Sequence, residues 1–152
     1  RGDSRRRDLN RLFQDDQVPE IDALKRALGR RNFSLAMMLH EDYDGVGLYI
    51  YEFFDTKPYW GEAMLKAAEP HVPADMRRSI EGREASGGLV RRKLDMELFK
   101  QIGLPEAVYF HLRGCPRVFT VETPSEYGLD RRVSAHAAVI SEGVRRALKE
   151  RA

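Results

Sequence analysis

Cysteine is nearly absent from this chain of 152 residues, since Cys115 is the single one. One cysteine excludes an internal disulfide and leaves the redox compartment open. Its apolar neighbours predict a packed thiol rather than a nucleophile. Long hydrophobic runs are also absent, because none approaches the roughly 20 residues of a membrane span, and no signal peptide is recognisable. The sequence therefore predicts a soluble protein with no membrane partner; it leaves the compartment open and favours the cytoplasm.

An excess of charge of one sign is lacking as well. The chain carries 26 basic and 24 acidic residues, for a net charge of +2. Many arginines stand in pairs or triplets, namely 5–7, 30–31, 77–78, 91–92, 131–132 and 145–146. Nucleic acid binding is one interpretation of such pairs, but the basic residues are spread along the chain rather than clustered. We favour solvated helix faces and loops, and expect no nucleic acid partner.

The chain also lacks an initiator methionine and begins at Arg1. We expect it to be the C-terminal part of a longer protein. Its length suffices for one domain with a sizeable core. Hydrophobic residues make up 42% and charged residues 33%, which is ordinary for a globular protein. We expect a single domain over residues 1–152.

Helical and extended patterns alternate along the sequence. Pro19 begins a helix that Gly29 ends. The expected helices are 19–28, 58–68, 93–102 and 131–151, with a short one near Asp75; the expected strands are 33–40, 48–54, 107–112 and 117–122. In the last helix we expect a buried stripe of Val133, Ala137, Ile140, Val144 and Leu148. The alternation predicts an α/β fold with a mixed, mostly parallel sheet flanked by helices.

The run Phe33–His40 is the stretch around which we expect the chain to be organised. It is apolar up to His40, and Glu41 and Asp42 follow directly. A short apolar run is typical of a buried strand of a parallel sheet. Open α/β sheets place their chemistry beyond the carboxyl ends of such strands. His40 is therefore a candidate metal ligand, although a lone histidine there is more often structural.

Two further stretches carry groups that suit the chemistry of a carboxylate substrate. Asn10 and Arg11 offer an amide beside a planar guanidinium, which binds a carboxylate with two hydrogen bonds. Glu122 ends an apolar strand, where a carboxylate is costly unless it has a partner. In that place it could activate a water molecule. An ordinary loop arginine and a capped turn carboxylate remain the alternatives.

Taken in this order, the three stretches resemble the zinc carboxypeptidase family with its succinylglutamate desuccinylase and aspartoacylase relatives. The matching elements are Asp8-Leu-Asn-Arg11, the strand ending in His40, and Phe119-Thr-Val-Glu122. Ala85-Ser-Gly-Gly88 resembles the loop after the family's mobile tyrosine. The resemblance implies a zinc carboxypeptidase-like fold, incomplete at its N-terminus, with Zn²⁺ as the cofactor.

The resemblance also assigns roles to individual residues. It implies that His40 binds zinc, that Glu122 is the catalytic residue, and that Asn10 and Arg11 bind the substrate carboxylate. Arg83 stands at the place of the family's tyrosine; it could contact an anionic substrate group or face water. Arg1 is a weak match for the arginine that stabilises the oxyanion. A tyrosine hydroxyl could come from residue 49, 51 or 127, and the sequence selects none of them.

One expected motif is missing from the sequence. The family takes two zinc ligands from a His-x-x-Glu motif, and none of the four histidines here has a glutamate three residues later. We expect those ligands upstream. The sequence thus predicts a hydrolase that cleaves an amide bond next to a free carboxylate, in a peptide C-terminus, a cell-wall peptide or an N-acyl amino acid. The alternative is a non-catalytic fragment or a carboxylate-binding relative without a complete metal site.

Overall fold

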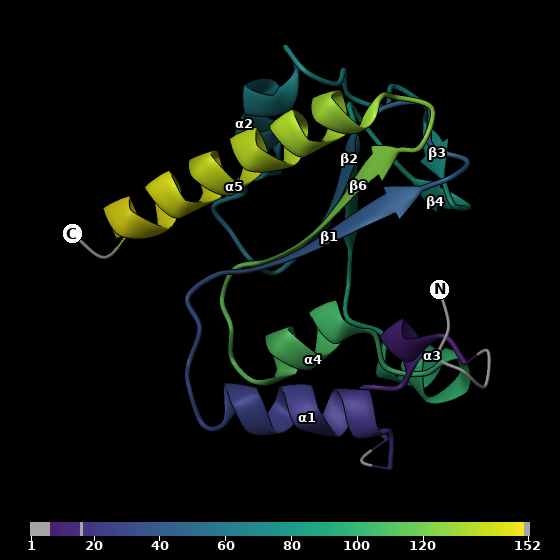
Figure 1. Cartoon of the computed structure of the whole chain (residues 1–152), viewed down its shortest axis with the longest axis vertical. Helices are drawn as coiled ribbons and strands as arrows, with labels where there is room; N and C mark the ends of the chain where they lie inside the picture. Colours follow the sequence, from purple (N-terminus) through teal and green to yellow (C-terminus); the bar gives the residue numbers. More distant parts are fainter. Residues whose placement is uncertain (1–6, 16, 151–152) are drawn as a thin grey trace.

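A sheet lies between two layers of helices in this computed structural model, which describes residues 7–15 and 17–150 (Figure 1). Within this part of the chain the strand order is β1-β6-β2-β5. The strands are β1 (Ala36–Asp42), β2 (Tyr49–Phe53), β5 (Leu89–Arg92) and β6 (Val118–Pro124). β1 is parallel to β6 and β2 is parallel to β5, whereas β6 and β2 are antiparallel. The predicted α/β fold with a mixed, mostly parallel sheet is confirmed.

Each face of the sheet packs against its own helices. Helices α2 (Gly61–Ala68) and α5 (Leu129–Glu150) cover one face; α1 (Pro19–Leu28), α3 (Met96–Ile102) and α4 (Glu106–Leu112) lie on the other (Figure 1). Alternate residues of a strand point to opposite faces. Phe119 and Val121 of β6 therefore join the core under α5 and α2, while Val118 joins the core with α1, α3 and α4.

Helix α4 corrects the prediction of a strand over residues 107–112. The aromatic and β-branched residues of this segment favour a strand. However, Pro105 is the N-cap residue and Glu106 lies in the first turn, and α1 also begins with a proline followed by a glutamate, although there the proline is the first helical residue. Ala107 and Val108 are buried in the core. Packing against the sheet therefore decides the conformation of this segment, rather than residue propensity.

The short helix expected near Asp75 was also wrong. The backbone N–H of Asp75 donates to the carbonyl oxygen of Leu48 at 2.8 Å, in the manner of a strand. Its buried carboxylate accepts from the backbone and side chain of Arg77, including Nη2 at 2.6 Å. Burial alone would raise the pKa of Asp75, but the bonds from Arg77 outweigh it and hold the pKa below its usual value.

Helix α5 forms as predicted, but the predicted buried stripe was wrong. The residues it buries are Ala135, Val139 and Gly143. A Cβ atom on Gly143 would lie 1.9 Å from Cε of Met37, so the small residue allows the helix to sit close to the sheet. Most of the predicted stripe is exposed, with 57% for Val133, 37% for Ile140, 44% for Val144 and 64% for Leu148.

Glu142 of α5 provides a test of surface electrostatics. Its carboxylate accepts from Arg145 and from Nε of Arg146 at 2.7 Å, and these guanidinium groups lower its pKa to about 2. Because the pKa of this carboxyl group is lower in the folded than in the unfolded state, the ionised group stabilises the fold at pH values above the unfolded-state pKa. This contribution is lost as the pH falls through the folded-state pKa. We expect Glu142→Gln to lower the free energy of unfolding by about 1 kcal/mol at pH 7.

The comparison is made by urea denaturation at pH 7 and near pH 2, where wild type and variant should converge. Glu97→Gln is the control, because the Glu97–Lys100 pair is exposed and should contribute less than about 0.5 kcal/mol. A difference for Glu142→Gln that stays constant between the two pH values would contradict the electrostatic explanation.

A two-stranded hairpin of β3 (Ser79–Ile80) and β4 (Arg83–Glu84) lies beside the sheet. Its turn holds Glu81 at a φ of 49° and Gly82 at 73°.

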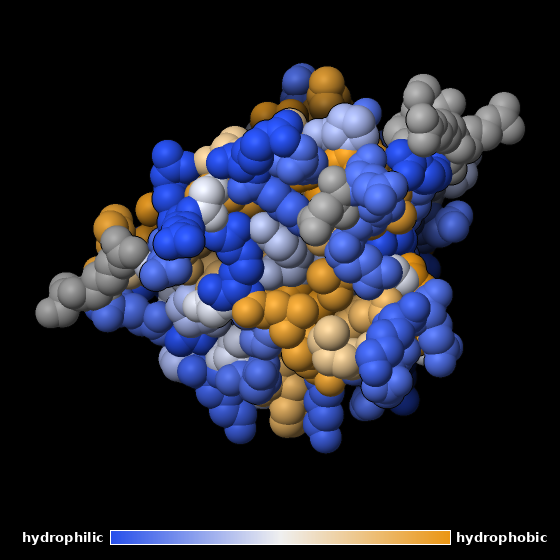
Figure 2. Space-filling view, turned by 90° about the horizontal axis from the view of Figure 1, so that it is seen from below, coloured by the Kyte–Doolittle hydropathy of each residue, from blue (hydrophilic) through white to orange (hydrophobic). Residues whose placement is uncertain are grey.

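Figure 2 shows the molecule from below, with a hydrophobic area among mostly hydrophilic side chains. None of the described helices is long and apolar enough to cross a membrane.

Candidate functional site

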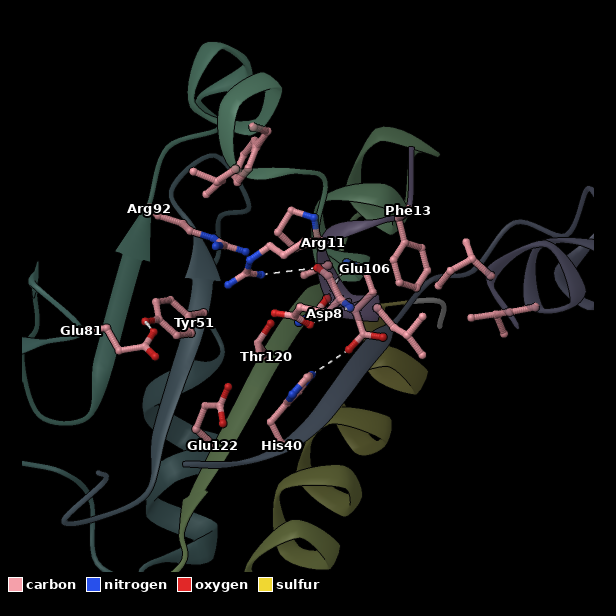
Figure 3. Close-up of a pocket in the computed structure, with 18 of the residues that line it drawn as sticks. Asp8, Arg11, Phe13, His40, Tyr51, Glu81, Arg92, Glu106, Thr120 and Glu122 are labelled. Carbon is pink, nitrogen blue, oxygen red and sulfur yellow. Dashed lines mark hydrogen bonds and ion pairs between the residues drawn. The ribbon is translucent and has the colours of Figure 1, made fainter. Parts of the chain in front are cut away.

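A cavity of about 460 Å³ lies beside the sheet, on the face covered by α1, α3 and α4. Its lining includes the 3-10 helix η1 (Leu9–Arg11), the ends of β1 and β6, and residues of the β3–β4 hairpin (Figure 3). All five residues singled out in the sequence line it: Asn10, Arg11, Arg83, His40 and Glu122. Arg1 lies outside the described residues. The fold thus gathers candidates that stand far apart in the sequence, while their roles remain predictions.

His40 and Glu122 occupy partner positions on two parallel strands. β1 and β6 run side by side, and His40 pairs in register with Glu122. Because the strands are parallel, their carboxyl ends meet at one edge of the sheet, where open α/β sheets carry their sites. Glu122 is 8% exposed. Thr120, two residues before Glu122, lines the same cavity.

Glu106 contacts His40 and was not singled out in the sequence. Oε1 of Glu106 lies 2.7 Å from Nε2 of His40. The backbone N–H of Glu106 donates to Oδ1 of Asn10 at 2.9 Å. Glu106 of α4 therefore connects this helix to β1 through its carboxylate and to η1 through its backbone N–H. Asn10 thus positions the start of α4 through its side-chain oxygen Oδ1, in addition to lining the cavity.

Backbone contacts fix the position of Arg11. Asp8 caps η1 by accepting from the backbone N–H of Asn10 at 3.0 Å, and Arg11 N–H donates to Asp8 O at 2.9 Å. The chain then pairs with the loop after α3, where Phe13 N–H donates to Leu104 O at 3.1 Å. Gly103 lies against the Arg11 carbonyl, and a Cβ atom there would come within 2.2 Å of it. These contacts thus fix the backbone of Arg11 relative to the loop after α3.

Arg92 of β5 is a second guanidinium group in the cavity that the sequence did not single out. Its guanidinium lies over three aromatic rings, at 5.3 Å from Tyr51, 5.1 Å from Phe53 and 5.9 Å from Phe99. Burial, followed by the positive charge of Arg83, lowers the pKa of Arg92 to about 10. Strand alternation is the signal that could have found it, because Arg91 and Arg92 must point to opposite faces.

Tyr51 is the tyrosine that lines the cavity; Tyr49 and Tyr127 do not. Its hydroxyl donates to the carboxylate of Glu81 at the hairpin turn. Burial and this hydrogen bond raise the pKa of Tyr51. Burial also raises the pKa of Tyr49, whose hydroxyl donates to Oδ2 of Asp42 at 2.9 Å. Both phenols are therefore protonated at neutral pH.

The described residues do not by themselves fit a catalytic zinc site. Such a site uses three protein ligands and a water molecule. In residues 7–15 and 17–150, no three His, Cys, Asp or Glu side chains are grouped to hold a metal. His40 is the imidazole that lines the cavity, and its Nε2 is engaged with Glu106. The chain thus presents one candidate ligand and two nearby carboxylates.

Solved structures with a similar fold include metallopeptidases. Two putative metallopeptidases, from Shewanella denitrificans and Shewanella baltica, match with TM-scores of 0.68 and 0.63 at 16% and 18% identity. The match covers 89% and 84% of this chain, but 49% and 45% of theirs. A metallo-carboxypeptidase from Burkholderia cenocepacia matches with a TM-score of 0.64 at 15% identity, over 100% of this chain and 41% of that one.

These likenesses show the fold. The chain has the α/β architecture of metallo-carboxypeptidase-like structures and spans less than half the length of each of these three. No family model and no curated protein matches the sequence. The fold predicted from the resemblance is therefore confirmed, whereas the subfamily, the substrate and the metal site are not addressed by these matches.

Proposed function

We propose that this chain is part of a zinc-dependent, metallocarboxypeptidase-like hydrolase, which cleaves an amide bond next to a free carboxylate. One observation carries the proposal: His40 and Glu122 are partners at the ends of parallel strands and face the same cavity as Arg11. The substrate would be a peptide C-terminus, a cell-wall peptide or an N-acyl amino acid. The similar fold of the metallopeptidase structures supports this reaction class.

The side chains of this chain would divide the work. Arg11 would clamp the substrate carboxylate and so fix the amide relative to Glu122. Glu122 would take a proton from the attacking water and return it to the leaving nitrogen. His40 would be one metal ligand, and the remaining ligands would come from outside the described residues. Glu106, which lies 2.7 Å from the imidazole, would fix the orientation of His40.

A second candidate is a carboxylate-binding module without catalysis. It is favoured by the finding that no three-ligand metal group exists among the described residues. Both functions use the guanidinium groups of the cavity, so carboxylate binding alone does not separate them. Turnover separates them, because the binding module would hold the substrate and release it uncleaved.

Arg11→Gln tests the carboxylate clamp that the proposal requires. In a protein that carries all the proposed zinc ligands, we expect KM for an acylated dipeptide with a free C-terminus to rise about 10- to 100-fold, since a charge-assisted hydrogen-bond pair is lost. The same dipeptide with a C-terminal amide should be hydrolysed at an unchanged rate, because it never had this contact. Released amino acid or amino acid amide is measured by chromatography.

Arg26→Gln is the matched control, because Arg26 is exposed on α1 and pairs with Asp22 rather than lining the cavity. It should leave both substrates unaffected. An equal loss on the free acid and the amide in Arg11→Gln would refute the clamp and point to a general structural effect of the substitution.

A further inference from the structure

Apolar side chains form one wall of the cavity, which the proposed reaction does not use. This apolar wall consists of Leu9 in η1, Phe13 after it, and Ile21 and Leu24 in α1, all of which line the cavity. Phe13 and Ile21 are each 4% exposed and belong to one core cluster, against which Leu9 packs. Their side chains carry no hydrogen-bonding group. The apolar wall can therefore bind a ligand only through its hydrocarbon part.

Leu24 is the exposed end of the apolar wall. It follows Ile21 by three residues, so the two side chains lie on one face of α1. Ile21 is buried, whereas Leu24 is 39% exposed although it lines the cavity. A hydrocarbon chain that covered Leu24 would remove apolar surface from water on both partners. The apolar wall thus has a buried floor and an exposed rim, where a ligand can add to the buried apolar surface.

The apolar wall borders the start of α4. The ring centroid of Phe13 lies 5.4 Å from that of Tyr109, and Ala107 belongs to the core cluster of Phe13. Ala107 directly follows Glu106, whose Oε1 lies 2.7 Å from Nε2 of His40. The apolar wall therefore begins close to His40, next to which the proposed function places the carbonyl group of the scissile amide.

Polar groups line the interval between Arg11 and Glu122. Figure 3 shows Thr120 in this interval, and Thr120 pairs in register with Tyr51. Both of these side chains line the cavity. A ligand with its carboxylate at Arg11 and its amide near Glu122 places its α-carbon here. A side chain on that carbon would meet hydroxyl groups, whereas the acyl group beyond the amide can extend toward Phe13.

We propose that the apolar wall binds an aliphatic acyl chain, so that the preferred ligand is an N-acyl amino acid with several methylene groups in its acyl part. Arg11 takes the carboxylate of the amino acid, and the acyl chain runs along Phe13 and Ile21 to Leu24. The inference rests on the proposed function for the role of Arg11, and it adds the chemical class of the acyl group. It makes Leu24 a specificity-determining residue. The cavity of about 460 Å³ has the size of a small-molecule site.

The test is calorimetric titration of the full chain with N-acetylglycine and with two isomers, N-hexanoylglycine and N-acetyl-L-leucine. The isomers place the same added carbon atoms on opposite sides of the amide, because glycine has no side chain. We expect N-hexanoylglycine to bind about 10- to 100-fold more tightly than N-acetylglycine, since burial of roughly two or three methylene groups corresponds to this factor. N-acetyl-L-leucine should bind within about threefold of N-acetylglycine.

Variants at the rim of the apolar wall locate this preference. Leu24→Ser should reduce the preference for the hexanoyl compound by at least about threefold and leave the affinity for N-acetylglycine unchanged. Leu24→Met, which keeps an apolar side chain, should retain the preference. Leu112→Ser is the control, because Leu112 is 50% exposed on α4 and does not line the cavity. Urea denaturation checks that the fold persists in each variant.

Two results would overturn the acyl-chain site outright: equal affinity for N-acetylglycine and N-hexanoylglycine, or a preference that Leu24→Ser leaves undiminished. Tighter binding of N-acetyl-L-leucine than of N-hexanoylglycine would overturn it as well, because the apolar wall would then hold the side chain of the terminal residue. The methyl ester of N-hexanoylglycine addresses the proposed function instead. If it bound as tightly as the free acid, the Arg11 clamp would be contradicted while the chain-length preference stood, so the two failures are distinguishable.

Discussion

Glu122→Gln is expected to reduce kcat about 10²- to 10⁴-fold while leaving KM nearly unchanged, because a general base contributes to the rate by about this factor. The substitution keeps the volume of the side chain and removes its ability to accept a proton. Glu122 is buried beside His40 near the end of β6, which is where the proposed reaction requires the attacking water. Steady-state hydrolysis of an acylated dipeptide, by a protein that carries all the proposed zinc ligands, measures the effect.

Glu126→Gln is the matched control for this experiment, since Glu126 is exposed and follows β6 by two residues. Its kcat should equal that of the wild type. Calorimetric binding of the same substrate should persist in Glu122→Gln, which separates a lost proton acceptor from a lost fold. Turnover within about threefold of the wild type would remove Glu122 from the mechanism.

Gly103→Ala is expected to have the largest effect on stability, about 2–4 kcal/mol of the free energy of unfolding. Gly103 has a φ of 86°, which disfavours a side chain, and an added Cβ would lie 2.2 Å from the Arg11 carbonyl. Relief of that overlap requires η1 and the loop after α3 to move apart. We therefore expect weaker binding of free carboxylates as well, because Arg11 moves with η1.

Gly114→Ala separates the two causes. Gly114 has a similar φ of 83°, but a Cβ there would meet no atom within 4 Å. It should cost about 1–2 kcal/mol from backbone conformation alone, with unchanged carboxylate affinity. Urea denaturation gives the stabilities of both variants. Equal losses in the two would mean that the contact between Gly103 and Arg11 has no energetic consequence.

Local sequence signals sufficed for the elements whose periodicity and end signals agree. The apolar run ending in His40 predicted β1, and Pro19 with Gly29 predicted α1. The prediction of a strand over residues 107–112 was wrong because the composition of this segment and its capping signal conflict. Tertiary packing decides such conflicts. The prediction of the buried face of α5 was wrong because a glycine and small residues permit close packing, which hydrophobicity alone does not indicate.

The candidate site could be predicted where its residues belong to recognisable stretches. His40, Glu122 and Arg11 each stand at the end of a motif, and the fold brings them to one cavity. Glu106 and Arg92 belong to no such stretch: the place of Glu106 depends on long-range packing, and the strand alternation that would have indicated Arg92 lies in β5, which was not among the expected strands. Glu106 reaches His40 because α4 is a helix rather than a strand, and Arg92 reaches Arg11 because β5 follows β2 in the sheet.

The exposed apolar residues of α5 lie on the same side of the molecule as an open strand. β1 ends the strand order, so in the described part of the chain no strand pairs with its outer edge. Arg132 of α5 pairs with Glu41 of β1, whereas Nε of Arg131 donates to the carbonyl oxygen of His71 in the loop after α2. The face with Val133 and Val144 therefore borders β1 rather than α2. Another strand and helix could be added here without disturbing either core, whereas in isolation the same border favours self-association.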